Sequence, residues 1–269
     1  IQFSTQEADC LFTDFNHMPF SLRKLKRAYS GWQDGLEGRG WNMLYIENHD
    51  HPRMVSRYGS EKYRTESAKM LAVSYLFLKG TPFIYQGQEI GMNNWRPKSI
   101  EEYRDVQTIY NYNTKYAKKT HEQRMAIEYR SSRDNARTPY QWDAGENAGF
   151  TSGKPWIKVN PRYTEINYEA DRNSPDSVFA YYQKLIALRN STPAIARGIY
   201  TSLDCSDKKF GGFLIEYEGE TIALFHNTWA EEVSYDLSTC KGLEGMTLTE
   251  LMGFIGVGDA KLEGNILTL

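Results

Sequence analysis

The sequence has little of several features that mark whole classes of protein. Its 269 residues include only three cysteines, Cys10, Cys205 and Cys240, which show neither metal-ligand spacing nor a disulfide framework. We therefore expect a reducing compartment, the cytoplasm. The formal net charge is −2, so no basic field is present to hold nucleic acid or anionic lipid.

Long apolar runs are also missing. The longest candidate, residues 70–78, is too short to cross a bilayer, so we expect no membrane partner. The chain begins with Ile1 rather than Met, and we expect it to be a piece of a longer polypeptide whose targeting segment, if any, lies upstream. Aromatic residues are plentiful at 14%, which provides rings for packing and for stacking against sugars.

The first part of the chain alternates between strand-like and helix-like segments. We predict strands at residues 9–15, 41–46 and 83–85 and helices at 22–36 and 65–79. The segment 41–46 (WNMLYI) is apolar on both faces, which is typical of a buried parallel strand. The order strand, helix, strand, helix, strand predicts two consecutive right-handed crossovers with parallel pairing.

The middle of the chain is predicted to be helical and then irregular. Ser99 and Glu102 fit a capping box, and helices are expected over much of residues 101–129. Residues 130–163 show no clear period, and a loop of this length inside a compact domain is usually functional. A further helix is predicted at 176–190, with Ser174 as its N-cap.

After about residue 193 the hydrophobic pattern changes to a period of two. Residues 213–217 and 221–226 predict a hairpin across the intervening Glu-Gly-Glu. Further short strands are predicted at 233–237, 246–251 and 266–269. We therefore expect two domains, an α/β domain at residues 1–193 and a small antiparallel β-domain at 194–269.

Polar residues follow two of the predicted parallel strands. His49, Asp50 and His51 come after the strand at 41–46, and residues 86–89 (QGQE) follow the next one. The carboxyl ends of parallel strands carry the active site in such architectures, because loops can vary there. This mostly uncharged set of hydrogen-bonding groups suits a polyhydroxyl ligand better than a phosphate or a metal.

Other interpretations of the His-Asp-His cluster remain open at this point. A metal site would need all three side chains to converge, whereas His49 and His51 point away from Asp50 in a regular strand, so we predict no metal. Retaining glycosidases hold two carboxylates about 5–5.5 Å apart, and Asp14 with Asp50 is a candidate pair whose geometry the sequence leaves undecided. A solvated surface cluster is the third interpretation.

Three motifs carry a resemblance to a known family. Residues 48–50 (NHD), with Pro52-Arg53 and residues 56–59 (SRYG), resemble the fourth conserved region of the α-amylase family of glycoside hydrolases. Residues 80–92 (GTPFIYQGQEIGM) are similar to that family's segment at its eighth barrel strand. Residues 132–143 (SRDNARTPYQWD), 147–150 (NAGF) and Pro155-Trp156 are similar to the signature of the oligo-1,6-glucosidase and α-glucosidase subgroup. The resemblance covers nearly the whole chain and loosens after about residue 201.

The resemblance implies a fold and a set of site residues. The fold would be α/β, a partial (β/α)8 barrel with its last three strand–helix units and a small C-terminal antiparallel β-sandwich. Asp50 would be the third acid of the family's catalytic trio, which holds glucose hydroxyls and strengthens its hydrogen bonds toward the oxocarbenium-like state. His49 would bind the same sugar, and Arg137 would contact sugar hydroxyls or the catalytic carboxylates. His51 would lie at the pocket edge.

Supporting roles follow for the neighbouring residues. The resemblance implies that Gln86, Gly87 and Glu89 shape the rim and that Arg53 and Arg57 anchor loops. Two positions depart from the pattern of many relatives, because Gln88 replaces a Glu and Tyr140 replaces a Met. These departures concern fine specificity rather than the reaction class.

The family's nucleophilic Asp and acid/base Glu lie on barrel strands that precede this sequence. We therefore expect the chain to be the C-terminal half of a retaining α-glucosidase and to be inactive alone. The enzyme would need no cofactor and would act on an oligosaccharide. The expected partner of the chain is the missing N-terminal half of the barrel or a second copy. The alternatives are a trehalose-6-phosphate hydrolase and a non-catalytic sugar-binding or scaffold relative.

Overall fold

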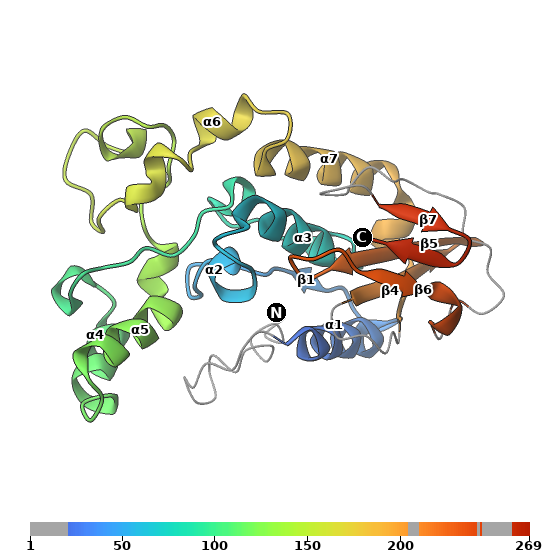
Figure 1. The fold of residues 1–269 in the computed structure, drawn as a ribbon, viewed down its shortest axis with the longest axis horizontal. Coiled ribbons are helices and arrows are strands. Elements are labelled where there is room, and N and C mark those ends of the chain that lie inside the picture. The colour runs from blue at the N-terminus through green and yellow to red at the C-terminus, as the bar shows by residue number, and fades with distance from the viewer. Residues whose placement is uncertain (1–20, 204–209, 241–242, 244–259) are drawn as a thin grey trace.

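The α/β part begins with helices that flank a short parallel pair of strands (Figure 1). The computed structural model describes residues 21–203, 210–240, 243 and 260–269. Its first elements are α1 (Leu22–Leu36), β1 (Met43–Leu44), α2 (Met54–Tyr58), α3 (Arg64–Leu76) and β2 (Thr81–Pro82). The predicted strand at 9–15, with Asp14, lies outside the described residues.

The pairing of β1 with β2 is parallel, as predicted. Met43 pairs with Thr81, and the Phe83 amide donates to the Leu44 carbonyl at 2.7 Å. Both strands are shorter than the sequence pattern predicts, and the second begins earlier than the predicted 83–85. Tyr85 already belongs to the following turn, where its carbonyl accepts from the Gln88 amide at 2.9 Å.

Short helices make up the middle of the chain. In chain order they are η2 (Gln88–Ile90), η3 (Ile100–Glu102), α4 (Val106–Tyr110), η4 (Asn111–Lys115), α5 (His121–Ser131), η5 (Arg133–Ala136), η6 (Glu146–Gly149), η7 (Pro161–Thr164), α6 (Tyr168–Arg172), α7 (Val178–Ser191) and α8 (Pro193–Arg197). Figure 1 places α4 and α5 at the end of the molecule opposite the antiparallel strands.

One predicted capping box and one predicted helix start are wrong. Ser99 is the N-cap residue of η3 but makes no side-chain cap bond, and a capping box forms instead at Thr120, whose hydroxyl accepts from the Gln123 amide at 3.3 Å. The N-cap of α7 is Ser177 rather than Ser174, because the Ser177 hydroxyl accepts from the Ala180 amide at 3.1 Å.

Two small antiparallel sheets form the C-terminal part. The first has the order β3 (Ile199–Ser202), β4 (Phe210–Tyr217), β5 (Glu220–Asn227), and the second has the order β6 (Ser234–Asp236), β8 (Ile266–Thr268), β7 (Lys261–Glu263). The predicted hairpin is confirmed, with Glu218 and Gly219 at positive φ values of 50° and 89° in the turn. The predicted strand at 246–251 lies outside the described residues, and β7 is a strand that the sequence pattern did not indicate.

Two apolar clusters hold these layers together. The larger one joins α1, β1, α3, α7 and the first sheet through buried residues such as Leu44, Leu71 and Leu185. The smaller one includes Leu214 from the first sheet and Leu267 from the second. Each such side chain contributes about 1.5–3 kcal/mol when it is buried.

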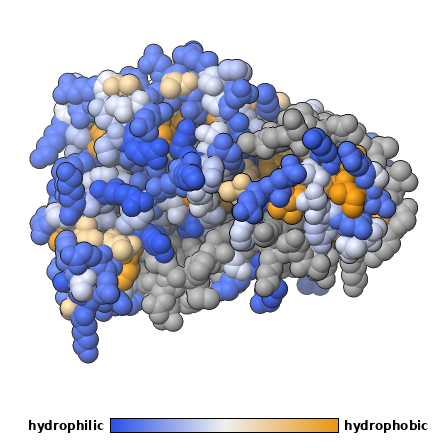
Figure 2. Space-filling model, viewed as in Figure 1, coloured by the Kyte–Doolittle hydropathy of each residue, from blue (hydrophilic) through white to orange (hydrophobic). Residues whose placement is uncertain are grey.

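A buried arginine links α7 to the turn before β2. Arg189 donates to the Leu78 carbonyl at 2.9 Å and to the carbonyls of Leu76 and Gly80. Among the described residues on the face in Figure 2, hydrophilic ones cover most of the surface. Across the described residues, no helix combines the length and the hydropathy that a membrane span requires.

Candidate functional site

A buried ion pair forms the base of the loop that follows β1. The Arg53 Nη1 lies 2.6 Å from Glu47 Oε1, and both side chains are fully buried. The Met54 amide donates to the other carboxylate oxygen at 2.8 Å. Burial raises the pKa of Glu47, and the charge of Arg53 counteracts that increase. The pair fixes both ends of the loop that carries His49 and Asp50.

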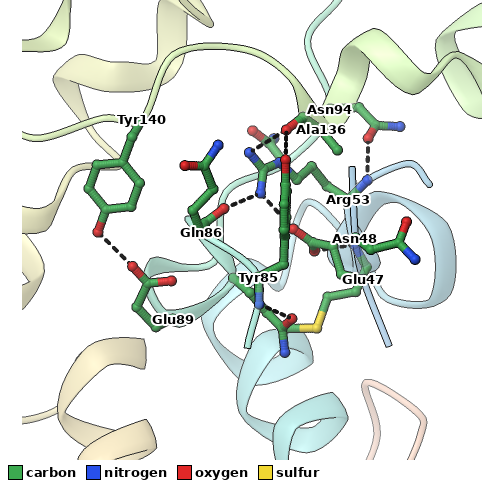
Figure 3. A network of polar contacts seen from close by, with 12 residues as sticks. Glu47, Asn48, Arg53, Tyr85, Gln86, Glu89, Asn94, Ala136 and Tyr140 are labelled. Carbon is green, nitrogen blue, oxygen red and sulfur yellow. Dashed lines mark hydrogen bonds and ion pairs between the residues drawn. The ribbon is translucent and has the colours of Figure 1, made fainter. Parts of the chain in front are cut away.

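Arg53 also reaches two other loops, as Figure 3 shows. Its Nη1 donates to the Gln86 carbonyl at 2.6 Å and its Nη2 to the Ala136 carbonyl at 3.3 Å. Its own amide donates to Asn94 Oδ1 at 2.9 Å. The Tyr85 hydroxyl donates to the same Ala136 carbonyl at 3.0 Å. The guanidinium group therefore joins three segments, at Glu47, Gln86 and Ala136, and the Arg53 backbone adds a fourth at Asn94.

The three site residues proposed from the sequence lie together above this network. Arg137 Nη2 is 2.7 Å from Asp50 Oδ1, and Arg137 Nε donates to the His49 carbonyl at 2.8 Å. His49 Nε2 is 3.3 Å from Asp50 Oδ2. The Asp50 side chain remains 47% exposed and His49 67%. The cluster therefore presents a carboxylate and an imidazole to solvent, where a ligand can reach them.

The expectation that His51 lies at the pocket edge is wrong. His51 is 2% exposed, and its ring is parallel to that of Tyr45 at a centroid distance of 6.2 Å. The turn after β1 sends His51 inward, so it does not join His49 and Asp50 at the surface. Within the described parts of the chain, no group of three or more histidine, cysteine or acidic side chains is arranged to hold a metal ion.

A second arginine–aspartate pair borders Asp50 and was not predicted. Arg133 Nη2 lies 2.5 Å from Asp105 Oδ1, and its Nη1 lies 3.8 Å from Asp50 Oδ1. Burial alone would raise the pKa of Asp105, but the hydrogen bonds and charge of Arg133 lower it. The sequence feature that could have indicated Arg133 is its spacing of four residues from Arg137 in the motif SRDNAR.

The residues after β2 make polar contacts of their own. Gln88 is fully buried and donates to the hydroxyls of Tyr75 and Tyr182, each at 2.8 Å. Figure 3 shows Tyr140 pointing toward Glu89, and its hydroxyl donates to the Glu89 carboxylate at 2.6 Å. Both residues that depart from the family pattern, Gln88 and Tyr140, therefore act inside the protein, through polar contacts with neighbouring side chains.

Gly87 occupies a position that favours glycine. Its φ is +86°, and a Cβ there would lie 2.3 Å from Met92 Sδ. The turn from Tyr85 to Gln88 can therefore pass close to Arg53 and accept its hydrogen bond.

The geometry of the site favours hydrogen bonding to hydroxyl groups. Asp50 has two carboxylate oxygens that accept, and the two guanidinium groups of Arg133 and Arg137 hold it on one side. The neighbouring carboxylates of Glu47 and Asp105 are tied to their own arginines. The site can bind vicinal hydroxyls, as a sugar ring presents them.

Comparison with known proteins places these residues in context. The profile of the alpha-amylase catalytic domain matches residues 2–198. An oligo-1,6-glucosidase from Parageobacillus thermoglucosidasius is 54% identical over 185 residues, which are 68% of this chain and 33% of that protein.

Solved structures agree with this match. The trehalose-6-phosphate hydrolase of Bacillus licheniformis has a TM-score of 0.84 at 41% identity, covering 90% of this chain and 44% of that one. A MutB mutant in complex with its substrate sucrose has a TM-score of 0.78 at 39% identity, covering 82% and 40%. The chain thus spans less than half the length of each of these relatives.

Proposed function

The chain belongs to the alpha-amylase family, and from this premise we propose that it is the C-terminal portion of a retaining α-glucosidase. The substrates are short oligosaccharides with α-1,6 or α-1,4 bonds. The observation that carries the proposal is the contact of Arg137 and His49 with Asp50 beyond the end of β1. The 54% identity to an oligo-1,6-glucosidase supports the substrate class.

In this proposal Asp50 binds the glucosyl ring and does not attack it. Its carboxylate accepts hydrogen bonds from adjacent sugar hydroxyls, and these bonds strengthen as the ring flattens toward the oxocarbenium-like transition state. Arg137 keeps one carboxylate oxygen in place at 2.7 Å. His49, whose imidazole is exposed, contacts the same sugar. No metal or cofactor is required for these roles.

The nucleophile and the acid/base residue come from the part of the barrel that precedes this chain. The parallel pair supports this division, because Trp41, Met43 and Phe83 are 54%, 39% and 47% exposed beside it. Parallel sheets are normally covered on both faces. We propose that the N-terminal half of the barrel, or a second copy, covers these side chains. Residues 1–193 are then barrel and 194–269 a β-sandwich domain, in a cytoplasmic protein.

Trehalose-6-phosphate hydrolysis is the second candidate, because the hydrolase from Bacillus licheniformis superposes with a TM-score of 0.84. Hydrolysis of isomaltose, maltose and trehalose-6-phosphate by the complete enzyme separates the candidates, with a β-glucoside as the negative control. We expect the neutral α-glucosides to be preferred. Preference for the phosphorylated sugar would favour the second candidate, and a folded enzyme inactive on all three would refute both.

The isolated chain provides a separate test of the division. It should give no turnover of p-nitrophenyl α-glucoside above a blank, since the residues proposed for bond cleavage lie outside it. Turnover by the purified chain alone would show that this part of the proposal is wrong.

A further inference from the structure

We propose that Arg53 is a positioning residue for the candidate site. It fixes the position of the loop bearing His49 and Asp50 relative to the loop bearing Arg137. The inference rests on the proposed function for its kinetic readout. It goes beyond that function because Arg53 is fully buried and therefore acts on the site through its neighbours.

The hydrogen bonds of Arg53 connect the two loops that form the Asp50–Arg137 contact. Asp50 and Arg137 come from segments 87 residues apart in the sequence, and their side chains meet at 2.7 Å. Beneath this contact, Arg53 Nη2 donates to the carbonyl of Ala136, the residue directly before Arg137. Arg53 itself follows Asp50 by three residues. One side chain therefore fixes the backbone on both sides of the functional contact.

The shape of the guanidinium group suits these acceptors. Its Nη1 serves both Glu47 and the Gln86 carbonyl at 2.6 Å, while Nη2 turns toward Ala136. A planar fork can serve these acceptors together, whereas a lysine ammonium is a single point charge that cannot reach all of them. Figure 3 shows these acceptors arranged around Arg53.

The energetics of the Glu47–Arg53 ion pair favour a role in orientation over one in stability. A buried ion pair is weak evidence for stability, because desolvation of both charges can cancel their attraction. The Glu47–Arg53 pair joins the two ends of the loop that carries Asp50, and Arg53 also reaches the residue before Arg137. The pair contributes mainly by orienting the loops, because charged hydrogen bonds to three segments restrict how far these loops can shift.

Arg189 is a matched control for Arg53. This arginine is also buried and also donates to three groups, the carbonyls of Leu76, Leu78 and Gly80. These carbonyls precede β2, at the end of the strand pair opposite to the site. If Arg53 only stabilised the fold, replacing either arginine would have the same kinetic consequence.

The test uses the complete enzyme with Arg53→Lys or Arg189→Lys, each alone and combined with Arg137→Lys. Kinetics on p-nitrophenyl α-glucoside are measured well below the unfolding temperature of every variant. We expect Arg53→Lys to lower kcat by about 10- to 100-fold with KM changed less than about threefold, because a small displacement of an aligned group is costly. Arg189→Lys should lower Tm and leave kcat within about threefold.

The combined variants supply a readout that a purely structural role would not affect. If Arg53 acts through Arg137 and Asp50, the two substitutions remove the same interaction. The kcat of the Arg53→Lys/Arg137→Lys double variant should then lie within about threefold of the kcat of the less active single variant. The losses of Arg189→Lys and Arg137→Lys should multiply. Multiplicative losses for the Arg53 pair, or equal kcat for Arg53→Lys and Arg189→Lys, would overturn the proposal.

Two further measurements cover a variant that does not fold and an enzyme that does not turn over the glucoside. Should Arg53→Lys fail to fold, Tyr85→Phe removes one hydrogen bond to the Ala136 carbonyl, and we expect a kcat loss of about fivefold, again non-additive with Arg137→Lys. A Tyr85→Phe enzyme with unchanged kcat would contradict the proposal.

Should the unaltered enzyme not turn over the glucoside, the proposed function fails, and hydrogen exchange decides the positioning role. Arg53→Lys should then speed exchange at residues 133–137, whereas Arg189→Lys should not. Equal exchange in the two variants would refute the role.

Discussion

Glu128 makes the stability of the protein depend on pH in a direction that can be tested. This α5 carboxyl is 1% exposed, and its Oε1 has no hydrogen-bond partner among the described residues. Burial, reinforced by the negative charge of Asp105, raises its pKa from the ordinary 4.5 to about 8. A hydrogen bond from Ser131 and the charge of Lys115 oppose this increase.

The sign of the effect follows from proton binding. Between pH 4.5 and about 8 the folded protein keeps a proton on Glu128 that the unfolded chain has lost. The free energy of unfolding therefore falls as pH rises through this window, and the contribution is complete only below pH 4.5. The full difference in pKa corresponds to an upper limit of about 5 kcal/mol. Relaxation and water entry around the ionised group reduce the expected effect to about 2 kcal/mol.

Urea unfolding of the wild type and Glu128→Gln at about pH 5 and about pH 9 measures this dependence. The variant should gain about 2 kcal/mol relative to the wild type between these two conditions, because glutamine does not ionise. Glu122→Gln on the same helix is the control. Backbone and Thr120 hydrogen bonds lower the pKa of Glu122, so this substitution should not produce the same change with pH. A stability difference between Glu128→Gln and the wild type that is constant with pH would refute the reasoning.

Three further predictions concern stability. Gly80→Ala should cost about 3 kcal/mol in urea unfolding, because φ is +144° and its Cβ would lie 2.5 Å from the Asn42 carbonyl oxygen, whereas Gly31→Ala, in open space on α1, should be neutral or stabilising. Thr120→Ala should lower the free energy of unfolding by about 1 kcal/mol through loss of its cap, and no change would contradict that role. Burial lowers the pKa of His226 to about 4, so thermal stability should fall as pH drops from 6.5 to 4, and His226→Gln should weaken that dependence.

Regular periodic segments were the most predictable from the sequence. The helix predicted at 22–36 matches α1 because Leu25 and Tyr29 recur on one buried face. The hairpin of β4 and β5 follows from period-two alternation around a turn in which Gly219 takes a positive φ. In both cases the pattern depends on neighbours in the sequence, so no distant contact was needed to predict it.

Helix starts were less predictable because distant groups compete for the same side chains. The Glu102 carboxylate accepts from the Lys98 amide and pairs with Lys158 instead of capping at Ser99. At α7, Asp171 accepts from the Phe179 amide, which favours a start at Ser177.

Within the candidate site, only the proximity of its exposed residues was predictable. His49, Asp50 and Arg137 follow from the position after a parallel strand and from the motifs, and the structure brings them together. Nothing local distinguishes the buried Glu47 from a surface glutamate, and the partner of Arg133 lies 28 residues away. Networks of this kind depend on which loops meet in space.

The most direct test of the account is the turnover of p-nitrophenyl α-glucoside by the complete enzyme with Asp50→Asn. The amide nitrogen donates rather than accepts, so one carboxylate contact to the sugar is lost while the shape is kept. We predict a loss in kcat of at least about 10³-fold with Tm nearly unchanged, since the lost interaction strengthens in the transition state. An enzyme that keeps kcat within about threefold of the wild type would contradict the assignment of Asp50.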